Sequence, residues 1–192
     1  EIRFCDWSSD VCSSDLFIIA SGSLPPGVPS NIFAQLGKIA KAKGAKYIVD
    51  TSGDALNQAA NEGVYLLKPN LGELSTLAGI KHVDIDKVEM IAKVVIREKK
   101  CEMIVVSLGA GGALLVTATE TYKAVPPEVN RKSAVGAGDS MVAGMVYSLS
   151  AGKNLEQSLR YGVACGTAAT MNPGTELCKK KDADFLYTLI SP

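Results

Sequence analysis

The chain has 192 residues, of which 47% are hydrophobic and 21% are charged, and 20 basic residues balance 20 acidic ones. This composition is typical of a globular protein, and the length fits one domain with a continuous core. The balanced charge argues against nucleic acid as the main partner, because phosphate binding usually leaves a clustered basic face. The longest apolar stretch, Met103 to Val116, is interrupted by Ser107 and by glycines, so no transmembrane segment is predicted.

The histidine and cysteine residues exclude several kinds of site. The single histidine, His82, would have to serve a Ser/His/Asp triad, a Cys/His dyad or a His-rich metal site alone, and we expect it on a surface loop. The five cysteines contain no C-x-x-C pair, which favours free thiols in a reducing cytoplasm; they are Cys5, Cys12, Cys101, Cys165 and Cys178.

Residues 1–16, EIRFCDWSSDVCSSDL, differ from the rest of the chain. They hold the only Trp and show neither a helical nor a strand period. The stretch resembles a sequencing-library adapter translated in frame, so we expect either an adapter-derived segment or a disordered tail and exclude it from the functional argument. Residues 17–192 are expected to form the folded unit.

From Phe17 onward, strands alternate with helices. The first half predicts, in chain order, a strand at Phe17 to Ala20, a helix capped by Ser30 and closed at Gly44, a strand at Tyr47 to Val49, a helix at Ala55 to Glu62, a strand at Val64 to Leu67, and helices at Leu71 to Ala78 and Asp86 to Lys99. The helix after Ser30 is predicted to bury one face, made by Ile32, Phe33, Leu36, Ile39 and Ala40.

The second half predicts strands at Met103 to Ser107 and Ala113 to Thr117, an edge strand at Thr121 to Pro127, and helices at Ala137 to Leu149, Leu155 to Thr170 and Asp182 to Leu189. This alternation indicates an α/β fold with a largely parallel sheet and helices on both faces. Ligands of such sheets bind outside the carboxyl ends of the strands, where the loops Ser21 to Gly27, Lys68 to Asn70 and Ser107 to Gly112 fall.

The sequence Gly136-Ala137-Gly138-Asp139 directly precedes the amphipathic run that begins at Met141. Bare backbone N–H groups at a helix N-terminus can cradle an anion. The same residues are also compatible with a plain turn in which Asp139 only caps the helix. A dinucleotide fingerprint is disfavoured because the third glycine is missing at the required spacing, and no Walker A sequence is present.

This turn occurs in one fixed order with four other stretches, namely SLPPG at 23–27, KPNLGE at 68–73, SLGAGG at 107–112 and NPGT at 172–175. Together they resemble the ribokinase/phosphofructokinase-B family of carbohydrate kinases and, within it, the B-type bacterial 6-phosphofructokinases. The resemblance implies a ribokinase-like fold and ATP-dependent phosphorylation of a sugar phosphate, with fructose 6-phosphate converted to fructose 1,6-bisphosphate in glycolysis. A 1-phosphofructokinase, a tagatose-6-phosphate kinase, an inactive nucleotide-binding fragment and, last, a dehydrogenase remain as alternatives.

The resemblance also implies a role for particular residues. Asp139 is the general base, Gly136, Ala137 and Gly138 form the anion hole with it, and Ser23 contacts the sugar phosphate. Mg²⁺ is held near the phosphates by Asn70 and Glu73, the N-x-x-E motif. The residues implied for ATP are Lys68, Asn70, Ser107, Gly109, Gly112, Val163, Thr167, Ala169 and Asn172. Those implied for K⁺ are Ser133, Val135, Asn172 and Gly174.

Members of this family carry a further N-terminal portion with the first βαβ units, most sugar-binding residues and a β lid that forms a homodimer. We therefore expect this chain to be the C-terminal, ATP-binding and catalytic portion of a cytoplasmic homodimeric enzyme, truncated at its N-terminal side. The strand at Phe17 to Ala20 would be a middle strand of the parent sheet and would expose an unpaired edge. Alone, the chain is expected to fold poorly or aggregate and to have little kinase activity.

Overall fold

The structure, a computed structural model, describes residues 16–99 and 101–191. Six strands form one sheet in the order β1-β2-β3-β4-β5-β6. Neighbouring strands from β1 to β4 are parallel, whereas β5 is antiparallel to both β4 and β6. The bounds are β1 Phe17–Ser21, β2 Lys46–Asp50, β3 Leu66–Leu67, β4 Met103–Ser107, β5 Ala113–Thr117 and β6 Thr121–Ala124. The prediction of a largely parallel sheet is confirmed.

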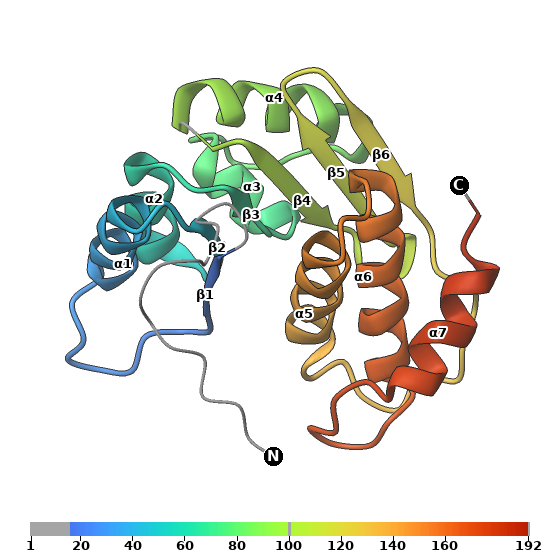
Figure 1. Cartoon of the computed structure of the whole chain (residues 1–192). Coiled ribbons are helices and arrows are strands. Elements are labelled where there is room, and N and C mark those ends of the chain that lie inside the picture. Colours follow the sequence, from blue (N-terminus) through green and yellow to red (C-terminus); the bar gives the residue numbers. More distant parts are fainter. Residues whose placement is uncertain (1–15, 100, 192) are drawn as a thin grey trace, which may run out of the picture.

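Helices cover both faces of the sheet, also as predicted (Figure 1). One face carries α1 Ile32–Ala42, α2 Gly53–Glu62, α3 Leu71–Leu77 and α4 Val88–Lys99, and the other carries α5 Ala137–Ser150, α6 Leu155–Thr170 and α7 Lys180–Leu189. Short 3-10 turns occur at Ile85–Lys87 and Gly109–Gly111. Within the described ranges, no helix has the length and apolarity needed to cross a lipid bilayer.

Each central strand is buried on both sides, because successive side chains point to opposite faces. In β4, Ile104 and Val106 belong to the core under α1–α4, whereas Met103 and Val105 belong to the core under α5–α7. Ile104, Val105 and Val106 are fully buried. The apolar run at 103–106 therefore has no polar alternation, as expected for a strand between two helical layers.

Helix α1 differs from its prediction in two respects. Its N-cap is Asn31, while the Ser30 hydroxyl accepts a 2.7 Å hydrogen bond from Gln58 Nε2, so the prediction that Ser30 caps the helix is wrong. Ile39 is 51% exposed instead of buried. The helix turns Gly37 toward the sheet because the Tyr47 ring lies there: a Cβ on Gly37 would lie 3.3 Å from Tyr47 Cε1. The Tyr47 hydroxyl also donates to the Phe33 carbonyl at 2.8 Å.

Smaller differences occur at three element ends. The third strand is only two residues long, the helix predicted from Asp86 starts as a 3-10 turn before Val88, and β6 ends at Ala124 instead of Pro127. Pro126 and Pro127 have no N–H to donate, which explains why the ladder stops before them. The edge position predicted for this strand is confirmed.

The opposite edge of the sheet is β1, which pairs only with β2 among the described residues. Ile19, in the middle of β1, is 45% exposed. The predicted adapter-derived segment, residues 1–16, lies outside the described residues except for Leu16. In Figure 1 the chain leaves β1 on the lower side of the molecule.

Candidate active site

The start of α5 depends on a glycine. Gly136, the N-cap residue, has φ +75°, a left-handed conformation that a side chain disfavours. Asp139 follows in the first helical turn, but no side chain caps this helix. Its carboxylate oxygen Oδ1 instead accepts a 2.8 Å hydrogen bond from the hydroxyl of Ser21, at the end of β1. The interpretation of Asp139 as a mere helix cap is therefore wrong.

The first turn of α5 also presents backbone N–H groups. The first four N–H groups of a helix have no acceptor within it, and the helix dipole makes this end positive. The Ala137 amide has a long contact of 3.4 Å with the Ala134 carbonyl. Among the described residues, the Gly138 and Asp139 amides have no such contact with a backbone carbonyl, so they are free to receive an anion.

A buried ion pair lies against this turn. The Lys68 ammonium, just after β3, is 3.1 Å from Asp50 Oδ1 at the end of β2, and the side chains are 8% and 17% exposed. A Cβ added to Gly138 would lie 3.3 Å from Lys68 Nζ and 3.7 Å from Asp50 Oδ2. Gly138 is therefore the residue that lets the ammonium approach the start of α5.

The pKa of the Asp50 carboxyl is affected by burial and by the other charged groups near it. Burial raises the pKa of this carboxyl above its ordinary value, and the attraction and hydrogen bond of Lys68 oppose that shift. The nearby charges of Glu73 and Asp139 raise it further. Three carboxyls and one ammonium are therefore close enough to influence one another, as is common where charged substrates bind.

Asn70 and Glu73 form a capping box at the start of α3. The Glu73 amide donates to Asn70 Oδ1 at 2.9 Å, and the Asn70 amide donates to Glu73 Oε2 at 2.8 Å. Glu73 thus has a structural role and is more than a solvated helix residue. Both side chains still offer oxygen lone pairs, and Mg²⁺ in kinases typically uses one or two protein oxygens plus water and phosphate, so this donor set fits it.

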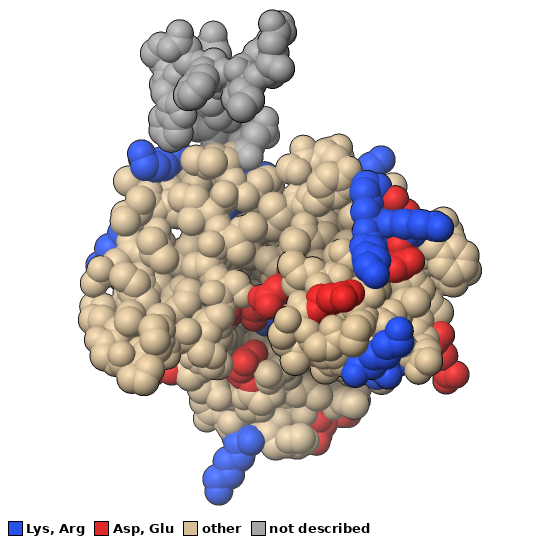
Figure 2. Space-filling model, turned by 90° about the horizontal axis from the view of Figure 1, so that it is seen from below, with Lys and Arg blue, Asp and Glu red and all other residues tan. Residues whose placement is uncertain are grey.

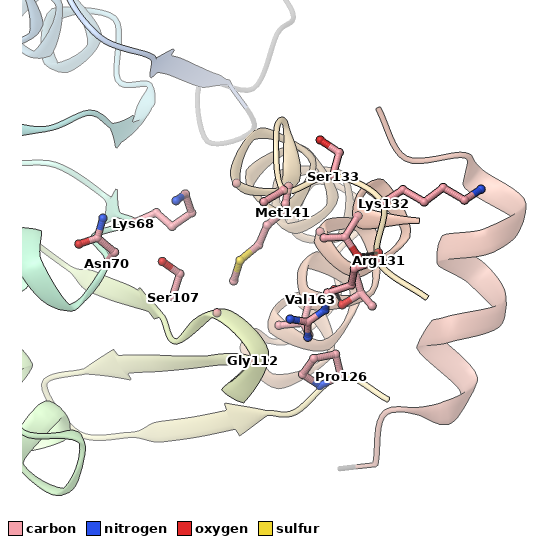
Figure 3. Close-up of a pocket in the computed structure, with 17 residues that line it drawn as sticks. Lys68, Asn70, Ser107, Gly112, Pro126, Arg131, Lys132, Ser133, Met141 and Val163 are labelled. Atoms are coloured by element: carbon pink, nitrogen blue, oxygen red, sulfur yellow. Dashed lines mark hydrogen bonds between the residues drawn. The ribbon is translucent and has the colours of Figure 1, made fainter. Parts of the chain in front are cut away.

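A cavity of about 580 Å³ extends from Lys68 along the start of α5 (Figure 3). This volume is within the usual range for small-molecule sites. Lys68, Asn70 and Ser107 lie on one side, while Arg131 and Val163 lie on the other. Seven residues implied for ATP line it: Lys68, Asn70, Ser107, Gly109, Gly112, Val163 and Thr167.

Figure 2 views the molecule from below Figure 1 and shows acidic side chains around a hollow in this face. Backbone amides at a helix N-terminus and a lysine line the cavity, and the Asp139 carboxylate directly follows Gly138 of this lining. This arrangement is suited to transfer of a phosphoryl group.

The comparison with known proteins decides the family. Residues 6–182 match the pfkB family of carbohydrate kinases. This chain belongs to that family.

Relatives within the pfkB family agree with this assignment. The chain is 42% identical, over 179 residues, to ATP-dependent 6-phosphofructokinase isozyme 2 of Escherichia coli K12, a match that covers 93% of this chain and 58% of that enzyme. It is 34% identical over 161 residues to the 1-phosphofructokinase of Rhodobacter capsulatus, covering 84% of this chain and 51% of that enzyme. The chain thus spans little more than half the length of the relatives it matches.

Solved structures of the family share the fold. Phosphofructokinase-2 from Escherichia coli in complex with potassium superimposes with a TM-score of 0.84 at 42% identity, over 90% of this chain and 56% of that one. Ribokinase from Arabidopsis thaliana, at 21% identity, gives a TM-score of 0.76 over 89% of this chain, which supports the ribokinase-like fold alone.

Eight of the residues implied for catalysis or ligands do not line the cavity of this pfkB-family chain: Ser23, Glu73, Val135, Gly136, Asp139, Ala169, Asn172 and Gly174. Gly136 and Asp139 directly flank the lining residues Ala137 and Gly138. Ala169 and Asn172 are buried and do not line it, and Asn172 Nδ2 donates to the Leu177 carbonyl at 2.9 Å. Ser23 is exposed in the loop after β1 and does not line it either.

Three of the four residues implied for K⁺ are linked by hydrogen bonds, and one of these, Ser133, lines the cavity. The Ser133 hydroxyl donates to the Gly174 carbonyl at 2.7 Å and accepts from the Val135 amide at 3.1 Å. Oxygen-rich loops of this kind suit a hard cation, so the donor set is compatible with K⁺. Among residues 16–99 and 101–191, no group of three His, Cys, Asp or Glu side chains clusters as a metal cage.

The sequence argument missed several residues of this site. Ser21 and Asp50 end β1 and β2, which is the same carboxyl-edge signal that singled out Lys68. Arg131 and Met141 line the cavity from the loop before α5 and from α5 itself. Lys132 is also at the cavity wall, although its side chain points away toward α7 (Figure 3). No spacing rule could have located these last three.

Proposed function

We propose that this chain is the nucleotide-binding and catalytic portion of an ATP-dependent kinase that phosphorylates a sugar phosphate. The observation that carries the proposal is the Asp139 carboxylate, held by Ser21 at the start of α5 and beside the Asp50–Lys68 pair. The substrate proposed is fructose 6-phosphate, and the product is fructose 1,6-bisphosphate. The enzyme would act in cytoplasmic glycolysis.

Asp139 is proposed as the general base. The Ser21 hydrogen bond engages Oδ1, and Oδ2 takes the proton of the sugar hydroxyl as its oxygen attacks the γ-phosphorus. Charge that builds on the phosphoryl oxygens is stabilised by the Gly138 and Asp139 amides at the positive end of α5. Such a preorganised donor contributes about 3 to 4 kcal/mol in well-studied enzymes. Asp139 would contact the sugar directly, whereas Ser21 positions it.

The nucleotide is proposed to lie along the cavity. Its phosphates would approach Lys68, which acts as a point charge, and its base would lie toward Val163 and Thr167. Gly112 allows close backbone approach: its φ is +84°, and a Cβ there would lie only 1.9 Å from the Ala124 carbonyl oxygen. Ser107 and Gly109 complete this wall.

Two cations are proposed for the site. Asn70 and Glu73 would hold Mg²⁺, which supplies charge neutralisation on the phosphates when bound. The Ser133, Val135, Asn172 and Gly174 oxygens would hold K⁺ beside the start of α5. A related structure contains potassium, which supports this second proposal.

The sugar and the assembly are the finer points of the proposal. Relatives include 6-phosphofructokinases and 1-phosphofructokinases, so fructose 1-phosphate is the main competing substrate, followed by tagatose 6-phosphate. Ser23 and Asp139 are the two residues of this chain proposed to contact the sugar phosphate. The enzyme is proposed to be a homodimer; a tetrameric inhibited form is known for phosphofructokinase-2 from Escherichia coli.

The test is a coupled phosphorylation assay on a chimeric chain in which the N-terminal portion of the Escherichia coli isozyme precedes Phe17. Asp139→Asn is expected to lower kcat by about 10²- to 10⁴-fold while ATP binding is retained. Asp86→Asn is the matched control, because Asp86 is exposed in the 3-10 turn before α4 and does not line the cavity, and it should leave kcat unchanged. Equal activity of Asp139→Asn and the parent would refute the mechanism, and turnover of fructose 1-phosphate alone would refute the substrate.

A further inference from the structure

A second cavity, of about 200 Å³, lies on the other side of α5 from the nucleotide cavity. Residues of α5, α6 and α7 line it, together with the segment that joins α6 to α7. The Ser140 hydroxyl, directly after Asp139, lines this cavity, is buried and has no hydrogen-bond partner in the described residues. The space is large enough for a small polar molecule, since water occupies about 30 Å³ in the liquid.

Two thiols meet in this cavity. Cys165, on α6, is only 4% exposed, while Cys178, in the joining segment, is half-buried, and neither is in a disulfide. Burial is the main cause that raises the pKa of the Cys165 thiol to about 12, and the neighbouring Cys178 side chain contributes to this rise. The two sulfur atoms are therefore within interaction distance of each other.

The packing keeps Cys165 in this position. A Cβ placed on Gly144 of α5 would lie 2.6 Å from Cys165 Sγ and 2.9 Å from its Cβ. Protein interiors are close-packed, so the Cys165 side chain cannot swing toward α5 without displacing that helix. Its sulfur is held at the cavity wall that it shares with Cys178.

We propose that Cys165 and Cys178 form a reversible redox site, which hydrogen peroxide converts to an intramolecular disulfide. This site is separate from the nucleotide cavity and does not depend on the proposed kinase function. Reversible disulfides of this type act as redox sensors in otherwise reducing compartments.

The reaction balances with peroxide as the sole oxidant. Cys178 Sγ attacks one peroxide oxygen, the O–O bond breaks, one water leaves, and Cys178 becomes a sulfenic acid. Cys165 Sγ then attacks the Cys178 sulfur, the S–O bond breaks, and the hydroxyl leaves with the Cys165 proton as a second water. Two electrons pass from sulfur to oxygen, so two thiols and one peroxide give one disulfide and two waters.

The difference in exposure between the two thiols indicates which of them reacts first. Cys178 is the half-buried thiol, so it meets the oxidant first. The Lys180 ammonium lines the same cavity and its charge partly offsets the rise in the pKa of Cys165, which favours loss of the proton in the second step. Cys165 is therefore the resolving thiol.

The disulfide would tie the joining segment to α6 next to the candidate active site. Leu177, the neighbour of Cys178, covers the αL glycine of α5: its Cδ2 would lie 3.1 Å from a Cβ on Gly136. Gly174 in the same segment accepts the hydrogen bond from Ser133. Oxidation thus acts on the segment that supports the Gly136 turn.

The test is peptide mapping by mass spectrometry of the full 192-residue chain, with and without hydrogen peroxide, after alkylation of free thiols under denaturing conditions. The expected product is a peptide pair joined through Cys165 and Cys178, lighter than the two thiol peptides by two hydrogen atoms and separated again by dithiothreitol. Cys101 is the internal control, because it is buried in the opposite core and should be alkylated in both samples.

Two variants separate the steps. Cys165→Ser should leave Cys178 as a sulfenic acid that dimedone labels, and Cys178→Ser should leave Cys165 reduced because its partner is gone. Far-UV circular dichroism checks that each variant remains folded. The proposal is overturned if the unmodified chain keeps both thiols alkylated after peroxide, if Cys178 pairs with Cys5 or Cys12 instead, or if Cys165 becomes oxidised in Cys178→Ser.

Discussion

Asp50 and Lys68 show how a single contact can serve a site without stabilising the fold. The pair is buried, yet the pKa of the Asp50 carboxyl lies above its ordinary value, because the loss of solvation outweighs the attraction of Lys68. The native state therefore holds the Asp50 proton more tightly than the unfolded chain does. Stability from the neutral carboxyl is fully present below the unfolded pKa and is lost as the pH rises through the folded pKa.

Asp50→Asn is accordingly expected to leave the free energy of unfolding at pH 7 unchanged or to raise it by up to about 1 kcal/mol. The difference from the parent should shrink as the pH falls, because protonation makes Asp50 neutral as well. Urea unfolding at pH 7 and at an acidic pH measures this. If the attraction between Asp50 and Lys68 outweighed the cost of burying them, the variant would lose about 3 to 5 kcal/mol at pH 7, which would contradict the expectation. Glu62→Gln, which breaks the exposed Lys38–Glu62 pair, is the control and should change stability by less than about 1 kcal/mol.

Ser21 and Ser23 flank one glycine but are expected to act on different kinetic parameters. Ser21 positions the base through its hydrogen bond to Asp139, so Ser21→Ala in the chimeric kinase should lower kcat by about ten-fold at constant KM. Ser23→Ala should raise the KM for the sugar phosphate and leave kcat nearly unchanged. Steady-state kinetics with both variants distinguishes these roles, and an identical effect of the two would show that the loop acts as one unit.

Two helices begin with the same capping box, and of the two boxes only that of α3 reaches the cavity, through Asn70. Asn70 with Glu73 caps α3, and Asn154 with Gln157 caps α6 through equivalent hydrogen bonds. The structural part of the Asn70 role can therefore be separated from its proposed role in binding Mg²⁺.

Asn70→Ala and Asn154→Ala are each expected to lower stability by about 1 kcal/mol, because each loses a capping hydrogen bond. Only Asn70→Ala should also weaken the affinity for MgATP. Glu73→Gln retains an acceptor for the cap but removes the charge, so it should lower the apparent Mg²⁺ affinity with little loss of stability. Calorimetric titration alongside urea unfolding measures both quantities; equal MgATP affinity in all three variants would argue against a metal role.

The loop between β4 and β5 contains two glycines with positive φ and different surroundings. At Gly109, φ is +58° and nothing lies within 4 Å of an added Cβ, whereas a Cβ on Gly112 would overlap the Ala124 backbone. Gly109→Ala should therefore cost about 1 kcal/mol, the usual penalty for the left-handed region. Gly112→Ala should cost more than about 3 kcal/mol, because β6 must move. Thermal unfolding ranks the pair, and similar values would show that β6 moves freely.

At the scale of the whole molecule, the sheet ends on β1, which is a parallel strand with an exposed edge. Parallel strands normally lie inside sheets, and exposed, unblunted edges promote association. The matches cover only 58% and 56% of two relatives, which therefore contain additional chain. We therefore expect the isolated chain to self-associate through the exposed edge of β1.

The isolated chain is expected to elute as aggregates in size-exclusion chromatography with light scattering. Ile19→Lys, which places a charge on the exposed centre of β1, should shift it toward monomer. Ile85→Lys is the matched control, because Ile85 is 70% exposed but lies away from the sheet edge. A soluble, cooperatively unfolding monomer of the unaltered chain would contradict the expectation.

The positions and order of most strands and helices of this protein could be predicted from its amino-acid sequence. Apolar runs separated by glycine and proline located the strands and helices, because these local preferences do not depend on distant residues. The ordered motifs indicated the family, and the Gly136–Asp139 turn located the candidate base. Seven of the nine residues implied for ATP do line the cavity.

Contacts between side chains that are remote in sequence could not be predicted in this way and are seen only in the folded structure. Ser21 and Asp139 are 118 positions apart, so their hydrogen bond follows from how β1 and α5 are packed and not from any local pattern. The rotation of α1 that exposes Ile39 depends on the Tyr47 ring, and the burial of the Asp50–Lys68 pair depends on the adjoining turn at Gly138. Contacts between segments remote in sequence are set by packing over the whole sheet. This is why Asp139 could be chosen as a candidate base from the sequence, whereas its partners Ser21, Asp50 and Lys68 could not be matched to it.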